Sequence, residues 1–183
     1  MTSSFDYFPL ASLFVIRMPS VLHEEFKSSI VDDIVQQLRS VAKGNGRASE
    51  FARCIKHGGS ATITFSDPGY GRHEPDALFR HREAQFPGVI IEISYTQKRR
   101  DLARVTQDYI LGSGGNIRAV VGIDIDYKDK SATLSIWQPQ LQDNEAGEEE
   151  LIANQILSNQ VCSHWFCLHI LTPDRSFVTK MAK

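Results

Sequence analysis

Cysteine is scarce in this sequence of 183 residues, which has three: Cys54, Cys162 and Cys167. An odd number cannot pair completely within one chain, and so small a number suits a reducing compartment. A disulfide-rich secreted scaffold is therefore excluded, and the cytoplasm or nucleus is the expected location. The stretch "CSHWFCLH" adds His164 and His169 to two of these cysteines, but its spacing matches no standard zinc finger.

Long apolar runs and a strong charge of one sign are missing as well. No run approaches the roughly 18 uninterrupted apolar residues that cross a bilayer, so we expect no membrane partner. The apolar patch Phe8–Ile16 lacks the basic lead of a secretory signal, so residues 1–19 are expected to form a strand or arm. The formal net charge is −2, so any surface for nucleic acid must be local.

Composition and hydrophobic periodicity predict one domain of mixed α/β structure. Hydrophobic residues make up 42% and charged residues 23% of the chain, which is ordinary for a globular protein. Helical spacing predicts helices over 20–43 and 97–111 and a shorter one over 49–55. Alternating or β-branched stretches predict strands over 60–66, 76–79, 89–95, 117–127 and 132–138.

The resulting order, α-β-β-β-α-β-β, indicates a mixed central sheet with helices on its faces. The short strands before 95 favour antiparallel pairing, and the helix after them allows a crossover to a parallel neighbour. We expect this domain to span residues 1–140, arm included. Residues 141–183 read as an acidic linker and a tail whose order the sequence leaves open.

One acid interrupts the most apolar strand. Glu92 lies within "VIIEISY", and Asp76 follows Pro75 on the preceding predicted strand. A carboxylate in an apolar interior costs several kcal/mol unless it is paired, hydrogen-bonded or bound to a metal. Two structural explanations stay open: Glu92 could pair with an arginine (Arg80, Arg82, Arg99 or Arg100), and Asp76 could cap a turn. If the acids instead share one site, they favour a hard divalent cation between them.

The pattern "PD…E-x-S" on these strands, followed by a helix, resembles the PD-(D/E)XK nuclease-like superfamily. The stretch "PDALF…PGVIIEISY…DLARVTQDYI" is most similar to its Uma2-like branch and to uncharacterised fungal proteins. The resemblance covers about 22–137 and implies a restriction-endonuclease-like fold. It also implies that Asp76, Glu92 and the carbonyl of Ile93 hold Mg²⁺ or Mn²⁺.

The sequence departs from that family at one position. Members that cut DNA carry a lysine two residues after the strand acid, where this chain has Ser94. We expect Lys98 to reach back in its place, or Gln97 to orient a water. Alternatively, the basic residues of "TQKRR" are solvated or contact phosphates without chemistry. Many members carry a further acid on the first helix, and here Glu24 and Glu25 are its candidates, with a role at the helix dipole as the alternative.

Two hypotheses of different class follow. The first is a Mg²⁺-dependent nuclease acting on nucleic acid, with Asp76 and Glu92 as metal ligands and with Ser94, Gln97 and Lys98 in the catalytic neighbourhood. The second is a catalytically silent member of the fold that binds nucleic acid or another protein. The oligomeric state, including a homodimer, is left open.

Overall fold

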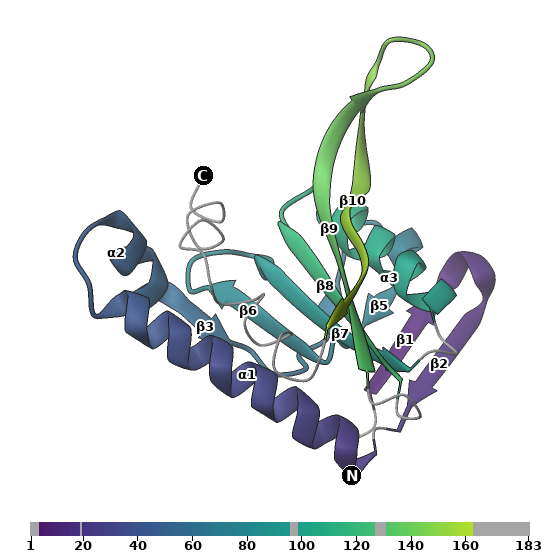
Figure 1. Cartoon of the computed structure of the whole chain (residues 1–183). Coiled ribbons are helices and arrows are strands. Elements are labelled where there is room, and N and C mark those ends of the chain that lie inside the picture. Colours follow the sequence, from purple (N-terminus) through teal and green to yellow (C-terminus); the bar gives the residue numbers. More distant parts are fainter. Residues whose placement is uncertain (1–3, 19, 96–98, 127–130, 163–183) are drawn as a thin grey trace.

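The computed structural model describes residues 4–18, 20–95, 99–126 and 131–162, which form a mixed α/β fold (Figure 1). Within these residues a large sheet has the order β10 (Glu149–Cys162), β9 (Ser131–Asp143), β8 (Ala119–Asp126), β7 (Val89–Tyr95), β6 (Ala77–His81) and β3 (Ile55–His57). A smaller sheet has the order β2 (Leu13–Arg17), β1 (Ser4–Phe8), β5 (Arg72–His73) and β4 (Ile63–Thr64). The helices are α1 (Val21–Ala42), α2 (Arg47–Cys54) and α3 (Arg99–Gly112), with single 3-10 turns η1 (Pro9–Ala11) and η2 (Pro68–Tyr70).

The pairing around β7 confirms the expected mixed sheet. Strand β6 runs antiparallel to β7, with Ala77 opposite Ile91. Helix α3 connects β7 to β8, and these two strands are parallel. A parallel pair of consecutive strands needs such a crossover connection. Strand β9 returns antiparallel to β8. The strand over 89–95 and the neighbouring helix were thus predictable from their apolar patterns.

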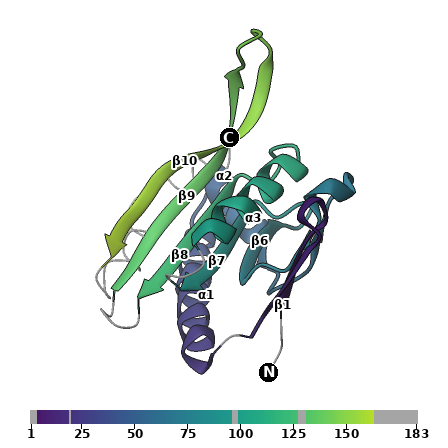
Figure 2. The same ribbon diagram turned by 90° about the vertical axis from the view of Figure 1, so that its right-hand side faces the viewer.

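Helices cover both faces of the large sheet. On one face, Ile91 and Ile93 of β7 pack in the cluster that contains Ile30 of α1. On the other face, Ile90 packs with residues of α3, among them Tyr109. Because successive strand residues point to opposite faces, Glu92 lies on the α3 face. The hairpin β1–β2 lies beside α3 (Figure 2) and contributes Phe8 to the same cluster.

Gly122, opposite Glu92 on β8, has a packing role. The register between β7 and β8 runs through it without a shift. A Cβ atom there would lie 2.5 Å from Leu102 Cδ2 and 3.0 Å from Trp137 Cζ3. The missing side chain therefore lets α3 approach the sheet closely.

Two expectations about elements are wrong. The stretch 60–66 contributes only β4, and to the smaller sheet; the strand that precedes β6 in the large sheet is β3, part of which was expected to be helical. Glu149–Cys162 forms strand β10 where a linker was expected, because its residues pair with β9. The strand or arm expected at the N-terminus is the hairpin β1–β2.

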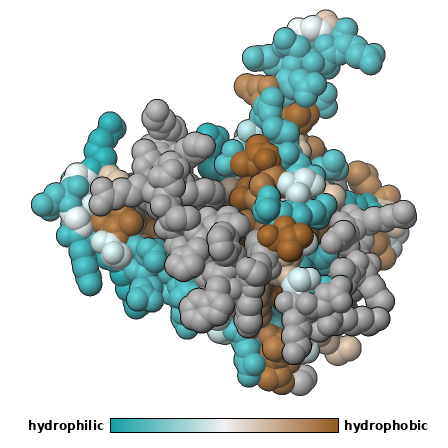
Figure 3. All heavy atoms as spheres, in the orientation of Figure 1, coloured by the Kyte–Doolittle hydropathy of each residue, from teal (hydrophilic) through white to brown (hydrophobic). Residues whose placement is uncertain are grey.

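The ends of β9 and β10 project from the body as a two-stranded ribbon (Figures 1 and 2). Its tip is hydrophilic, unlike the brown patches nearer the body (Figure 3). In the part of the chain that the structure describes, no helix is long and apolar enough to cross a bilayer.

Candidate functional site

The two acids singled out in the sequence meet in one pocket. Asp76 lies just before β6, and since Ala77 pairs with Ile91, the register carries Asp76 to the level of Glu92. The backbone N–H of Ile93 donates to Asp76 Oδ2 over 2.7 Å. Both acids are buried, with 7% and 4% of their surface exposed, and both line a cavity of about 100 Å³. The two acids therefore line the same pocket.

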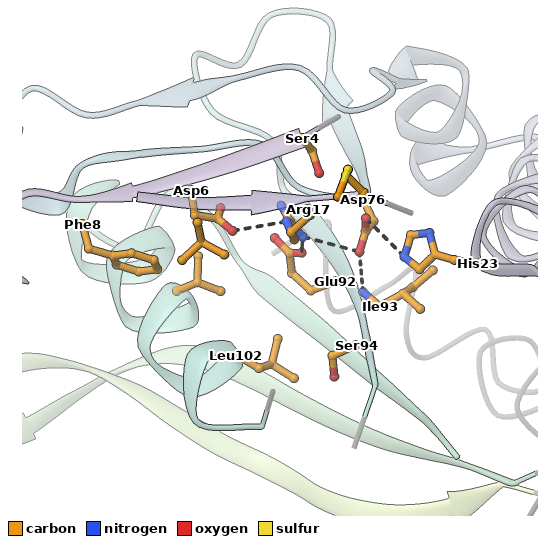
Figure 4. A pocket seen from close by; sticks show the side chains of 13 residues that line it. Ser4, Asp6, Phe8, Arg17, His23, Asp76, Glu92, Ile93, Ser94 and Leu102 are labelled. Atoms are coloured by element: carbon orange, nitrogen blue, oxygen red, sulfur yellow. Dashed lines mark hydrogen bonds and ion pairs between the residues drawn. The ribbon is translucent and has the colours of Figure 1, made fainter. Parts of the chain in front are cut away.

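A guanidinium group that the sequence did not single out lies between them. Arg17, the last residue of β2, places Nη1 2.7 Å from Glu92 Oε2 and 3.7 Å from Asp76 Oδ2 (Figure 4). Its Nε lies 3.2 Å from Asp6 Oδ2 on β1, and its Nη2 donates to the carbonyl of Glu74. The partner of Glu92 is thus Arg17 of the smaller sheet. Of the arginines first considered, Arg82 instead contacts Glu83 at the surface.

Burial and neighbouring charges shift the pKa values of the groups in this pocket. Burial raises the pKa of the Glu92 carboxyl to about 7; the charge of Arg17 offsets burial in part, while Asp76 and Asp6 raise it further. Burial lowers the pKa of Arg17, but the charges of Glu92, Asp6 and Asp76 outweigh it and hold the pKa above its ordinary value. The guanidinium is therefore always charged, and it lies against the carboxyl groups of Glu92, Asp76 and Asp6.

Every carboxylate oxygen of Asp76 and Glu92 has a partner within the protein. Tyr109 of α3 donates its hydroxyl to Glu92 Oε1 over 2.7 Å, and His23 Nε2 of α1 lies 3.5 Å from Asp76 Oδ1. Burial and the charge of Glu92 raise the pKa of Tyr109 well above 10.0, so its hydroxyl stays a donor. Burial lowers the pKa of His23, but Asp76 and then Glu24 outweigh burial and leave it raised.

A second buried cluster holds Asp6 in place. His73 of β5, which has no exposed surface, lies with Nδ1 3.1 Å from Asp6 Oδ1 and with Nε2 3.1 Å from Asp108 Oδ2. Burial lowers the pKa of His73, but the hydrogen bonds and charges of Asp108 and Asp6 outweigh burial and raise it to about 9. A charged imidazole therefore links α3 to the carboxylate that supports Arg17. His73 itself is not among the residues that line the pocket.

Ser94 lies on the wall of the pocket, away from the acids (Figure 4). Its hydroxyl donates to Asp124 Oδ1 of β8 over 3.3 Å. The side chain of Ile93 belongs to the cluster on the α1 face, so only its backbone reaches the site. Ser94 thus has a structural partner in the neighbouring strand.

Gln97 and Lys98 lie outside the described residues, as do His164, Cys167 and His169. Of the two helix acids, Glu25 is exposed, and Glu24 reaches the site indirectly, with Oε1 3.4 Å from His23 Nδ1. His81, the other histidine near Asp76 in sequence, stacks on Phe51 with ring centroids 5.5 Å apart.

Asp76 and Glu92 offer carboxylate oxygens, the ligands that a hard divalent cation prefers, but each of these oxygens already has a donor within the protein. Among the described residues, no three His, Cys, Asp or Glu side chains form a group that could hold a metal. A cation here would have two carboxylates, Asp76 and Glu92, and would complete its shell with water or phosphate, as Mg²⁺ commonly does.

No family model, curated protein or solved structure matches the chain.

Proposed function

We propose that this chain is a restriction-endonuclease-like domain of the PD-(D/E)XK type that hydrolyses phosphodiester bonds of nucleic acid with Mg²⁺ or Mn²⁺. The observation that carries the proposal is the convergence of Asp76 and Glu92, from neighbouring strands, in one buried pocket. The mixed strand pairing and the crossover through α3 support it, because they match the element order that the motif implies. The resemblance itself rests on the residues quoted from the sequence.

In this proposal Asp76 and Glu92 hold the cation, with the carbonyl of Ile93 as a further ligand. The cation supplies Lewis-acid stabilisation of the phosphate and lowers the pKa of a bound water. The chain itself must supply the positive charge that Ser94 lacks, and Arg17 is the described residue placed to do so. Arg17 cannot accept a proton, so its role is to stabilise charge that develops on the phosphate. Gln97 and Lys98 remain candidates on the basis of the sequence.

A second function is favoured by a different observation. The four carboxylate oxygens of the acid pair already have donors from Arg17, Ile93, Tyr109 and His23. Such a closed network suits a catalytically silent member of the fold, acting as a nucleic-acid-binding or protein-interaction module. The folding stability of such a module would not depend on a bound cation.

Cleavage assays separate the two functions. Purified protein is incubated with single- and double-stranded DNA and RNA, with Mg²⁺, Mn²⁺ or EDTA. We expect cation-dependent products from the unaltered chain and at least a roughly 100-fold lower rate for Asp76→Asn and for Glu92→Gln, since each removes a charged ligand. The matched controls are Asp32→Asn and Glu145→Gln, which change exposed acids far from the pocket.

Absence of cleavage with both cations, or equal rates in all four variants, would overturn the nuclease proposal. In that event, metal-independent binding of a labelled oligonucleotide would support the silent module in its nucleic-acid-binding form.

A further inference from the structure

We propose that the Arg17 guanidinium is an internal cation that occupies the divalent-cation position between Asp76 and Glu92 and competes with a metal ion for it. The inference rests on the proposed function in taking this acid pair as the cation site. It adds that metal binding and the Arg17–Glu92 ion pair exclude each other, and that Asp6 receives the displaced guanidinium.

The guanidinium of Arg17 lies where a shared cation would bind. Its Nη1 contacts both acids, 2.7 Å from Glu92 Oε2 and 3.7 Å from Asp76 Oδ2. A cation shared by two carboxylates lies between them, and that space is taken by this nitrogen. A metal ion and the guanidinium cannot occupy it together, because both positive charges would lie within a few ångströms of each other.

Arg17 has a second carboxylate partner, Asp6, besides the acid pair. Its Nε lies 3.2 Å from Asp6 Oδ2, on the side away from Asp76 (Figure 4). Asp6 is in turn held by His73 over 3.1 Å. The guanidinium therefore keeps a carboxylate partner if Glu92 turns to a metal ion. Its displacement does not leave a buried charge unpaired, which would be costly.

Arg17 belongs to the smaller sheet, whereas the acid that it contacts most closely, Glu92, belongs to the large one. It is the last residue of β2, and β2 is an edge strand of the smaller sheet among the described residues. Its long side chain spans from this sheet to the large one, so a change of side-chain conformation moves the charge without moving β7. The acids stay in place while their counter-charge changes.

Calorimetric titration of Mn²⁺ tests the competition without any assay of activity. We expect Arg17→Gln to bind Mn²⁺ about tenfold more tightly than the unaltered chain, or better, because the competing charge is gone. Asp6→Asn should bind Mn²⁺ more weakly than the unaltered chain, because the displaced guanidinium loses its second partner. Arg39→Gln, an exposed arginine on α1, is the control and should leave the affinity unchanged.

Arg17→Lys is included in case Arg17→Gln fails to fold, which circular dichroism would reveal. Lysine keeps the charge but contacts fewer groups at once, and its Mn²⁺ affinity should lie between those of the unaltered chain and Arg17→Gln. Equal or weaker Mn²⁺ binding in both Arg17 variants would overturn the inference. Cleavage is scored separately: tighter binding in Arg17→Gln with no cleavage by the unaltered chain would refute the nuclease proposal and leave the competition intact.

Discussion

Hydrogen bonds from several donors compensate in part for the burial of the Glu92 carboxylate. Arg17 approaches one of its oxygens and Tyr109 the other, both over 2.7 Å. Even so, burial raises the pKa of the carboxyl to about 7, so the compensation is incomplete. An acid kept under such conditions, and not replaced by an apolar residue, is typical of a functional position.

Tyr109→Phe tests how much of this compensation comes from α3. The substitution keeps the ring but removes the hydroxyl that donates to Glu92 Oε1, and the tyrosine has no exposed surface. We expect the free energy of unfolding to fall by about 1.5–3 kcal/mol, the range for a buried hydrogen bond to a charged group. Urea denaturation measures it, with Tyr7→Phe as the control because Tyr7 is 40% exposed. Equal effects of the two substitutions would mean that the hydroxyl does not stabilise Glu92.

Among the elements, the pairing of β1 with β5 places Asp6 opposite His73. Gly71, just before β5, allows the two strands to approach each other this closely. Gly71 has a φ of +76°, in the left-handed region, and a Cβ atom there would collide with the carbonyl oxygen of Tyr7. Gly71→Ala should therefore lower the free energy of unfolding by about 2–4 kcal/mol, through overpacking and backbone strain together.

Thermal and urea unfolding measure this loss. Gly88→Ala is the control, because a Cβ atom at Gly88 meets nothing within 4 Å and its φ is not in the left-handed region. A loss in Gly71→Ala no larger than that of Gly88→Ala would show that β1 can move away from β5 at little cost. The site could then not depend on a rigid hairpin.

The elements predictable from the sequence are those with a long periodic pattern. Helix α1 and strand β7 carry such patterns, and Ser20 caps α1 by accepting from the backbone N–H of His23 over 3.2 Å. Strand β3 has three residues, too few to show alternation, so its placement depends on its partner β6. Strand β10 mixes polar and apolar residues without strict alternation and is defined by its pairing with β9.

The same limit applies to the candidate site. Asp76 and Glu92 were identifiable because an acid beside apolar strand residues is locally unusual. Arg17 is separated from Glu92 by 75 residues, and nothing in the local sequence distinguishes it from a surface arginine. Tyr109 lies in a stretch of helical spacing, but its hydrogen bond to Glu92 depends on how α3 packs. Local pattern thus identified the acids, and only the three-dimensional packing shows what neutralises them.

At the scale of the whole molecule, one chain of charged side chains joins three layers. It runs from Asp108 on α3 through His73 and Asp6 of the smaller sheet to Arg17, and from there to Glu92 of the large sheet. Tyr109 of α3 adds a second polar link, because its hydroxyl donates to Glu92 Oε1. His73 and Glu92 are the members of this chain whose pKa values are raised, to about 9 and about 7.

The pH dependence of stability tests the link through His73. The pKa of His73 is raised from 6.5 to about 9, so its stabilisation is fully present below pH 6.5 and is lost as the pH rises through 9. The shift corresponds to about 3 kcal/mol of unfolding free energy. Since Glu92 and His23 also have raised pKa values, the useful quantity is the difference between the unaltered chain and His73→Gln.

Urea unfolding is measured at pH 6, 7.5 and 9.5. The difference in unfolding free energy between the unaltered chain and His73→Gln should shrink by most of about 3 kcal/mol from pH 6 to pH 9.5. His57→Gln is the control, because burial lowers the pKa of His57 and the stabilisation by His73 is left intact. A difference that stays constant from pH 6 to 9.5 would mean that His73 is neutral in the folded protein. Asp6 would then be held by an uncharged hydrogen bond, and Arg17 would be the sole positive charge in the chain that joins the layers.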